Sequence, residues 1–130
     1  MPIKKEKKKI LVVDDDEFNL AIANAMLSAK YEISIVKSGK AALSVLAKGF
    51  VPNLILLDLL MPEMDGWETF NKIKGVSYLH TAPIVFVTSV TDAAEKKRAM
   101  KIGAADFITK PFEQEALLEK VKVLAEKHGK

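Results

Sequence analysis

The sequence predicts an α/β protein in which five βα units form one doubly wound, five-stranded parallel sheet with helices on both faces. Two observations support this prediction. Apolar runs of four to six residues, rich in Ile, Val and Leu, lack the alternation of a half-exposed strand and are typical of strands buried on both faces. Segments with apolar residues at three- and four-residue steps separate these runs and indicate helices. The connections are short, and right-handed crossovers would place the helices on both faces.

The first half of the chain supplies two strands and two helices. The run Ile10–Val13 is followed by Asp16, a good N-cap residue for a helix. A second strand is expected near residues 31–36, after which Ser38 introduces a helix that Gly49 ends. The apolar positions of these two helices are Phe18, Ile22, Ala25, Met26 and Ala29 in the first, and Ala42, Leu43, Leu46 and Ala47 in the second.

The second half of the chain continues the pattern with three more units. Leu54–Leu57 and Ile84–Val87 are predicted strands, and Asp92 can cap a helix that ends near Gly103. The remaining elements are a helix after Gly66 with Trp67, Phe70 and Ile73, a short strand at Phe107 and Ile108, and a last helix from about Glu113 with Leu117, Val121 and Leu124. We therefore expect one domain over residues 9–128, preceded by a basic arm over residues 1–8.

Composition limits the class of protein. With 130 residues and 49% hydrophobic composition, the chain can bury the core of one domain. The absence of cysteine excludes disulfides and thiolate metal sites. No apolar run approaches the roughly 20 residues of a membrane helix, and the amino end lacks a signal-peptide core, so we expect a soluble cytoplasmic protein. The net charge of +3 owes much to five lysines near the amino end, which we interpret as a solvated tail, because no aromatic residues alternate with them as in a nucleic-acid binder.

Polar side chains follow the predicted strands at the points where the strands end. Asp14 and Asp15 follow the first strand, Asp58 the third and Thr88 the fourth, and Lys110 lies two residues beyond the fifth. The carboxyl ends of parallel strands share one edge of the sheet, where ligands of such sheets bind. Three carboxylates, a hydroxyl and an ammonium therefore converge on one crevice, which favours a metal and phosphoryl site.

The three carboxylates predict a bound cation. Two carboxylates about 4 Å apart would repel by roughly 4 kcal/mol at an effective dielectric constant of ~20. Such a cluster either raises a pKa or recruits a cation, and oxygen ligands beside a phosphoryl group favour Mg²⁺, with Mn²⁺ also suitable. The alternative is helix capping, because acidic residues are stabilised at a helix N-terminus. We prefer capping for Asp16 and the cation site for Asp14 and Asp15.

These motifs together resemble the receiver domain of two-component response regulators. The similarity rests on Asp14-Asp15, the segment from Asp58 to Gly66, Thr88-Ser89 and Lys110-Pro-Phe112, and it extends over about residues 9–127. Because all these positions match with their spacings, the resemblance is specific. It implies the flavodoxin-like strand order 2-1-3-4-5 and a single-domain fold similar to the chemotaxis regulators.

The resemblance implies a role for each polar residue of the crevice. Asp58 would be the phosphoacceptor, which takes a phosphoryl group from a histidine kinase or a histidine phosphotransfer domain. Asp15 and Asp58 would ligate Mg²⁺ directly, Asp14 would do so mostly through water, and the backbone carbonyl of Leu60 would be a further ligand. The two remaining residues would contact oxygens of the phosphoryl group; they are Thr88 and Lys110.

The resemblance also implies a switch. Phosphorylation would draw the Thr88 hydroxyl inward and let Phe107 rotate from an outward to an inward position, with a core phenylalanine that never moves as the alternative. The change would alter the surface made by the fourth helix, the fifth strand and the fifth helix, where a downstream effector protein would bind. No membrane is expected as a partner, nor is nucleic acid without an output domain. The Lys110–Pro111 peptide bond is predicted to be cis, which would direct the Lys110 ammonium into the crevice.

Two other classes of protein are the alternatives. A Mg²⁺-dependent aspartyl-phosphate phosphatase or hydrolase of related fold usually carries a second acid two residues beyond its nucleophile, where this chain has Leu60. A degenerate receiver would lack one of the key residues, and none is missing. We therefore expect a switch that catalyses its own phosphorylation and dephosphorylation, without turnover of an outside substrate. Apolar Leu60 and Val90 predict slow dephosphorylation, because neither can orient a water molecule.

Overall fold

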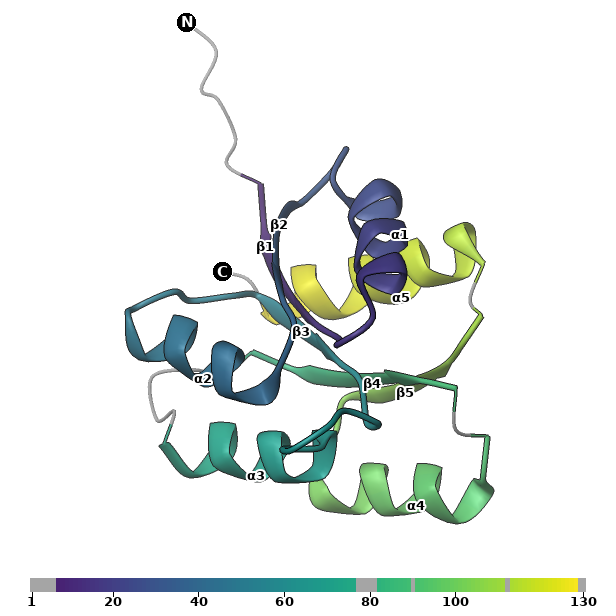
Figure 1. The fold of residues 1–130 in the computed structure, drawn as a ribbon. Coiled ribbons are helices and arrows are strands. Elements are labelled where there is room, and N and C mark those ends of the chain that lie inside the picture. Colours follow the sequence, from purple (N-terminus) through teal and green to yellow (C-terminus); the bar gives the residue numbers. More distant parts are fainter. Residues whose placement is uncertain (1–6, 77–81, 90, 112, 129–130) are drawn as a thin grey trace, which may run out of the picture.

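The computed structural model describes residues 7–76, 82–89, 91–111 and 113–128. Strands and helices alternate strictly along the described chain (Figure 1). The elements are β1 (Lys9–Val13), α1 (Glu17–Leu27), β2 (Glu32–Val36), α2 (Gly39–Ala47), β3 (Leu54–Leu57), α3 (Gly66–Val76), β4 (Ile84–Thr88), α4 (Ala93–Ile102), β5 (Asp106–Thr109) and α5 (Gln114–His128). All ten predicted elements are present.

The sheet is parallel throughout, with the strand order β2-β1-β3-β4-β5. Helices α1 and α5 lie on one face of this sheet, and α2, α3 and α4 lie on the other (Figure 1). The predicted doubly wound fold and its strand order are therefore confirmed.

Two apolar layers hold the helices to the sheet. Side chains of β1 alternate between them: Leu11 and Val13 belong to the layer under α2, α3 and α4, whereas Ile10 and Val12 belong to the layer under α1 and α5. Because both faces of the strand are covered, every second position is as apolar as its neighbours. This is why the strands occur in the sequence as uninterrupted apolar runs.

The apolar positions that predict α1 are not the residues that this helix buries. The helix buries Leu20, Ala23 and Leu27, whereas Phe18 is 71% exposed and Ile22 is only half-buried. Apolar residues occur on both sides of this helix, so their spacing alone predicts a helix without deciding which side faces the sheet. The structure places the smaller Ala23 against the sheet and leaves an apolar row on the surface.

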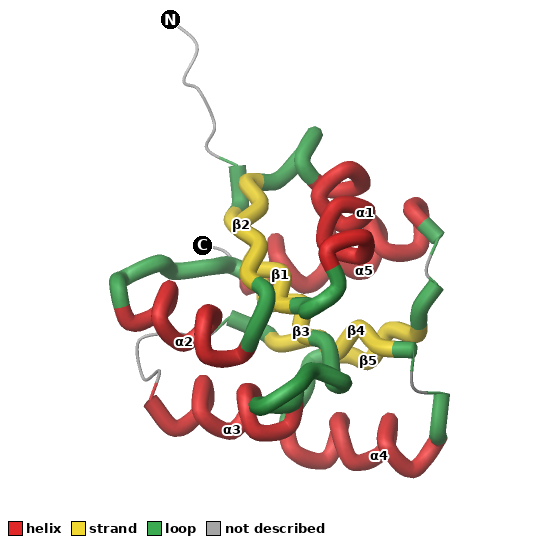
Figure 2. Tube along the Cα trace, viewed as in Figure 1, coloured by secondary structure: helices red, strands yellow, loops and turns green. Residues whose placement is uncertain are grey.

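The loops at the carboxyl ends of the strands are fixed by local hydrogen bonds. As predicted, the Asp16 carboxylate caps α1 by accepting a hydrogen bond from the Phe18 N–H over 2.9 Å, and Asp92 caps α4 in the same way through the Ala94 N–H. Figure 2 shows the loops after β1 and β3 at the same end of the sheet. Within the described residues, no helix has the length and apolar character that a membrane span requires.

Candidate functional site

The predicted convergence of polar side chains is present at the carboxyl edge of the sheet. Carboxylate oxygens of Asp14, Asp15 and Asp58 all lie within 4.8 Å of one another. The Lys110 Nζ atom lies 2.6 Å from Asp14 Oδ2 and 3.7 Å from Asp58 Oδ2. Four residues that are up to 96 positions apart in the chain thus form one cluster.

Strand pairing brings the two buried acids together. Val13 on β1 is the register partner of Leu57 on β3, so the next residue of each strand, Asp14 or Asp58, lies beside the other. The Asp58 N–H also donates a hydrogen bond to the Val13 carbonyl oxygen over 2.9 Å, which continues the pairing past the end of β3. The two carboxylates therefore have little freedom to move apart.

Both carboxylate oxygens of Asp14 already have donors. Asp14 Oδ1 accepts a hydrogen bond from the Asp16 N–H over 2.9 Å, and Oδ2 accepts the one from Lys110 Nζ. Asp14 is buried, whereas Asp15 points into solvent. The oxygens of Asp14 are therefore less available to a cation than those of the exposed Asp15.

Burial dominates the electrostatics of Asp58, which is 6% exposed. The pKa of its carboxyl is raised from 3.8 to about 6, chiefly because burial removes solvation, with smaller contributions from the charges of Asp14 and Asp15. The Lys110 ammonium and a backbone hydrogen bond from Leu60 act in the opposite direction without cancelling the effect. Asp58 therefore holds its negative charge at a cost that a second cation would relieve.

Lys110 reaches the cluster from the segment after β5. Its N–H donates a hydrogen bond to the Thr88 carbonyl oxygen over 2.8 Å, so the chain beyond β5 continues alongside the end of β4. The Lys110–Pro111 peptide bond is cis, as predicted. Thr88 is fully buried at the end of β4, and its strand partner is Thr109. The two predicted phosphoryl contacts thus lie at the end of β4 and directly after β5.

The donor set fits a hard divalent cation. Three carboxylates within 4.8 Å of one another offer oxygens only, and oxygen is the ligand that a hard ion such as Mg²⁺ or Mn²⁺ prefers. Leu60, the predicted carbonyl ligand, lies in the loop between β3 and α3, with a side chain that is 59% exposed. The residues present therefore suit the predicted cation, and Asp14 suits a place in its outer shell because its oxygens are already engaged.

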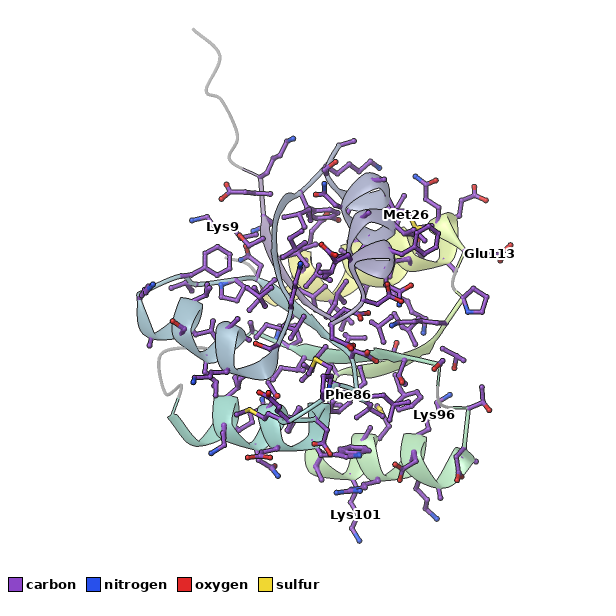
Figure 3. The ribbon with its side chains drawn as sticks, in the orientation of Figure 1. Lys9, Met26, Phe86, Lys96, Lys101 and Glu113 are labelled. Atoms are coloured by element: carbon purple, nitrogen blue, oxygen red, sulfur yellow. The ribbon has the colours of Figure 1, made fainter. Side chains whose placement is uncertain are left out.

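The ring of Phe107 is buried in this structure. It is 5% exposed and lies in the apolar layer under α2, α3 and α4, with its centroid 6.5 Å from that of Phe86. Phe86 in turn contacts Trp67 and Phe70, and Figure 3 shows it between the sheet and the helices α3 and α4. The outward position that the sequence prediction assigns to Phe107 before phosphorylation is therefore not the one seen here. Val90, the second predicted determinant of dephosphorylation, lies outside the described residues.

An apolar groove next to the crevice was not predicted. It has a volume of about 410 Å³ and runs between α1 and the segment after β5, where Phe18, Ile22, Met26 and Pro111 line it. Lys110 borders both the groove and the acidic crevice. The signal in the sequence was the row of apolar residues at four-residue steps on α1, which predicts a helix without showing that part of the row lies on the surface.

Comparisons with known proteins agree on one family. The family model of the response regulator receiver domain matches residues 10–122 of the chain. Among curated proteins, the response regulator PleD of Caulobacter vibrioides is 37% identical over 117 residues, which cover 89% of this chain and 26% of PleD. The chain spans only part of the curated relatives that it matches. Its share of their length is about a quarter for PleD and about half for several transcriptional regulators.

Solved structures show the same likeness. The signal receiver domain of a signal transduction histidine kinase from Syntrophus aciditrophicus is 33% identical, with a TM-score of 0.83 and coverage of 95% of this chain and 93% of that one. A response regulator receiver domain protein from Methanospirillum hungatei is 28% identical, with a TM-score of 0.85 and coverage of 95% and 97%.

Proposed function

Because this chain belongs to the response regulator receiver domain family, we propose that it accepts a phosphoryl group on Asp58 from a histidine kinase or a histidine phosphotransfer domain. The observation that carries this proposal is the position of Asp58, buried at the carboxyl edge of the sheet within reach of two further carboxylates and the Lys110 ammonium. The proposed receiver domain comprises residues 9–128, with residues 1–8 as an arm before it, and it acts in the cytoplasm.

Each polar residue of the crevice has a separate proposed role in phosphoryl transfer. A carboxylate oxygen of Asp58 attacks the phosphorus in line, the P–N bond to the donor imidazole breaks, and the electron pair of that bond stays with the imidazole. The Lys110 ammonium and the Thr88 hydroxyl bind oxygens of the transferred group. Mg²⁺, when it is bound by Asp15, Asp58 and the Leu60 carbonyl, neutralises part of the phosphoryl charge.

Phosphorylation of Asp58 is tested directly by mass. Incubation of the protein with acetyl phosphate and Mg²⁺ is expected to add one phosphoryl group, as measured by intact mass spectrometry. Asp58→Asn should abolish the gain in mass, because the amide lacks the carboxylate oxygen that attacks the phosphorus. Asp16→Asn should keep the gain. Unchanged mass of the wild-type protein, together with failure to bind beryllofluoride, would contradict the proposal and indicate a degenerate receiver.

The apolar groove between α1 and Pro111 is where we place the phosphodonor. The donor must bring its phosphohistidine to Asp58, so its body has to lie against the surface next to the crevice, and Lys110 lines both the crevice and the groove. Phe18, Ile22 and Met26 are spaced by four residues and form a row along α1. Such a row fits the apolar side of one helix of the donor.

A donor-selective loss of rate is the expected signature of this docking surface. Phe18→Ala should slow transfer from a phosphorylated histidine phosphotransfer domain by about tenfold or more, because a large apolar contact is lost at the interface. The rate with acetyl phosphate should stay unchanged, since that donor needs no docking. Val51→Ala, which truncates another exposed apolar residue away from the groove, is the control. Equal slowing with both donors would argue against docking at this groove.

The proposed output is a change in the surface formed by α4, β5 and α5, triggered through Thr88 and Phe107. Burial of Thr88 at the end of β4 supports a link between the crevice and the interior, and the contact between Phe107 and Phe86 provides a path to α3 and α4. Thr88→Ala should weaken the amide chemical-shift changes that beryllofluoride induces in these elements. The double variant tests the coupling. If its loss of these chemical-shift changes equals the sum of the losses in Thr88→Ala and Phe107→Ala, the two residues are not coupled.

The hydrolase alternative is less well supported. The position two residues beyond Asp58, where such an enzyme would carry its general acid, is the exposed and apolar Leu60. The proposed function is thus that of a switch controlled by phosphorylation and not that of an enzyme that turns over an outside substrate.

A further inference from the structure

Gly66 begins α3 directly against the backbone of the phosphoacceptor. Its N–H donates a hydrogen bond to the Leu59 carbonyl oxygen over 2.8 Å. A side-chain carbon at this position would overlap the Asp58 carbonyl oxygen and would lie 2.7 Å from the Leu59 Cα atom. Carbon atoms in good contact are about 3.5 to 4.0 Å apart, so any other residue would displace one of the two backbone segments.

Displacement of either backbone segment would disturb the hydrogen bonds and the packing that hold it. On the strand side, Asp58 is held by its hydrogen bond to the Val13 carbonyl oxygen, and the Leu59 side chain is 2% exposed in the core. On the helix side, the Asp65 carbonyl oxygen accepts hydrogen bonds from the Thr69 N–H and the Thr69 hydroxyl, at 3.0 and 2.8 Å. Thr69 is itself fully buried. A displacement would therefore change the position of Asp58 relative to the start of α3.

The same contact closes the loop that carries Leu60. The hydrogen bond between Gly66 and Leu59 joins the two ends of this loop, so the intervening residues 60–65 leave and return at one point. Leu59 and Met61 are buried on either side of the exposed Leu60, which ties the loop to the core. The shape of the loop, and with it the position of the Leu60 carbonyl, depends on how closely α3 approaches the end of β3.

We propose that Gly66 is a positioning residue of the phosphoacceptor site. Its missing side chain lets the start of α3 hold the Asp58 backbone and the loop with the Leu60 carbonyl in the arrangement that binds the cation and receives the phosphoryl group. This inference rests on the proposed function of Asp58. It predicts that a single methyl group at position 66 weakens cation binding before any phosphodonor is added.

The test compares Gly66→Ala with two control variants. Gly75→Ala adds a methyl group to the same helix at an exposed position with no atom within 4 Å, so it should leave the site unchanged. Leu27→Ala removes a fully buried side chain at the far end of α1 and should lower stability without touching the site. The Mg²⁺ dissociation constant is measured by calorimetry, and the phosphorylation rate with acetyl phosphate by mass, on samples shown by circular dichroism to be folded.

In Gly66→Ala, we expect the Mg²⁺ dissociation constant to rise about tenfold and the phosphorylation rate to fall about 100-fold, as for a misplacement of about 1 Å. Both control variants should keep the wild-type values. Wild-type Mg²⁺ affinity in folded Gly66→Ala would overturn the inference. So would a Gly66→Ala protein that stays unfolded where Leu27→Ala folds, because the contact would then serve the fold and not the site. If wild type itself is not phosphorylated, the proposed function fails first, which is a separate outcome.

Discussion

Lys110→Met is expected to lower the free energy of unfolding of the metal-free protein by about 3 to 5 kcal/mol. The Lys110 ammonium is 13% exposed and lies 2.6 Å from a carboxylate oxygen of Asp14 and 3.7 Å from one of Asp58. Without it, the cluster of three carboxylates has no cation within contact distance among the described residues. Removal of one partner leaves buried charge uncompensated, which costs more than the pair itself contributes. Urea unfolding in the presence of a chelator measures the loss.

A matched lysine separates this effect from loss of a surface ion pair. Lys120 pairs with Asp106 at 2.8 Å, but both side chains are much more exposed, so Lys120→Met should cost less than about 1 kcal/mol. Mg²⁺ should restore much of the stability of Lys110→Met and should stabilise it more than it stabilises wild type, because the cation and the ammonium neutralise the same carboxylates. Equal stability losses in the two variants would show that the Lys110 pair is not a buried one in solution.

Asp58→Asn is expected to have the opposite effect and to raise the stability of the metal-free protein above pH 7. Burial raises the pKa of Asp58 from 3.8 to about 6, so the folded protein holds a proton there more tightly than the unfolded chain does. The stability that this proton provides is complete below pH 3.8 and is lost as the pH rises through about 6. At higher pH the wild-type protein keeps a buried charge that the amide variant lacks. At about 1.4 kcal/mol per pKa unit, the gain should be about 1 to 3 kcal/mol.

The pH dependence identifies the cause of this gain. Free energies of unfolding of both proteins, measured with a chelator between pH 4 and pH 8, should differ most at pH 8 and converge near pH 4, where Asp58 becomes protonated in either state. Asp16→Asn is the control, because Asp16 is an exposed helix cap and asparagine caps a helix equally well. A gain of the same size at every pH would exclude the titration of Asp58 as its origin.

Much of the fold and the site followed from local patterns. Strands buried on both faces must be continuously apolar, and the residues that end such runs are forced to the same edge of a parallel sheet. Asp14, Asp58 and Lys110 could therefore be placed together from their positions in the chain, and their clustering is confirmed. The helix caps at Asp16 and Asp92 were predictable for the same reason, since a cap depends on residues only two or three positions away.

The sequence by itself thus determined the order of the elements and the chemistry that gathers at the ends of the strands. Only the tertiary structure decided which side of α1 faces the sheet, because both sides carry apolar residues and the choice depends on how the helix packs. It also decided that Lys110 lies nearer to Asp14 than to Asp58, and that Phe107 is buried beside Phe86. The close approach of Gly66 to the backbone of Asp58 is of the same kind. These features depend on distances between segments far apart in the chain, and close packing fixes such distances only when the whole domain is folded.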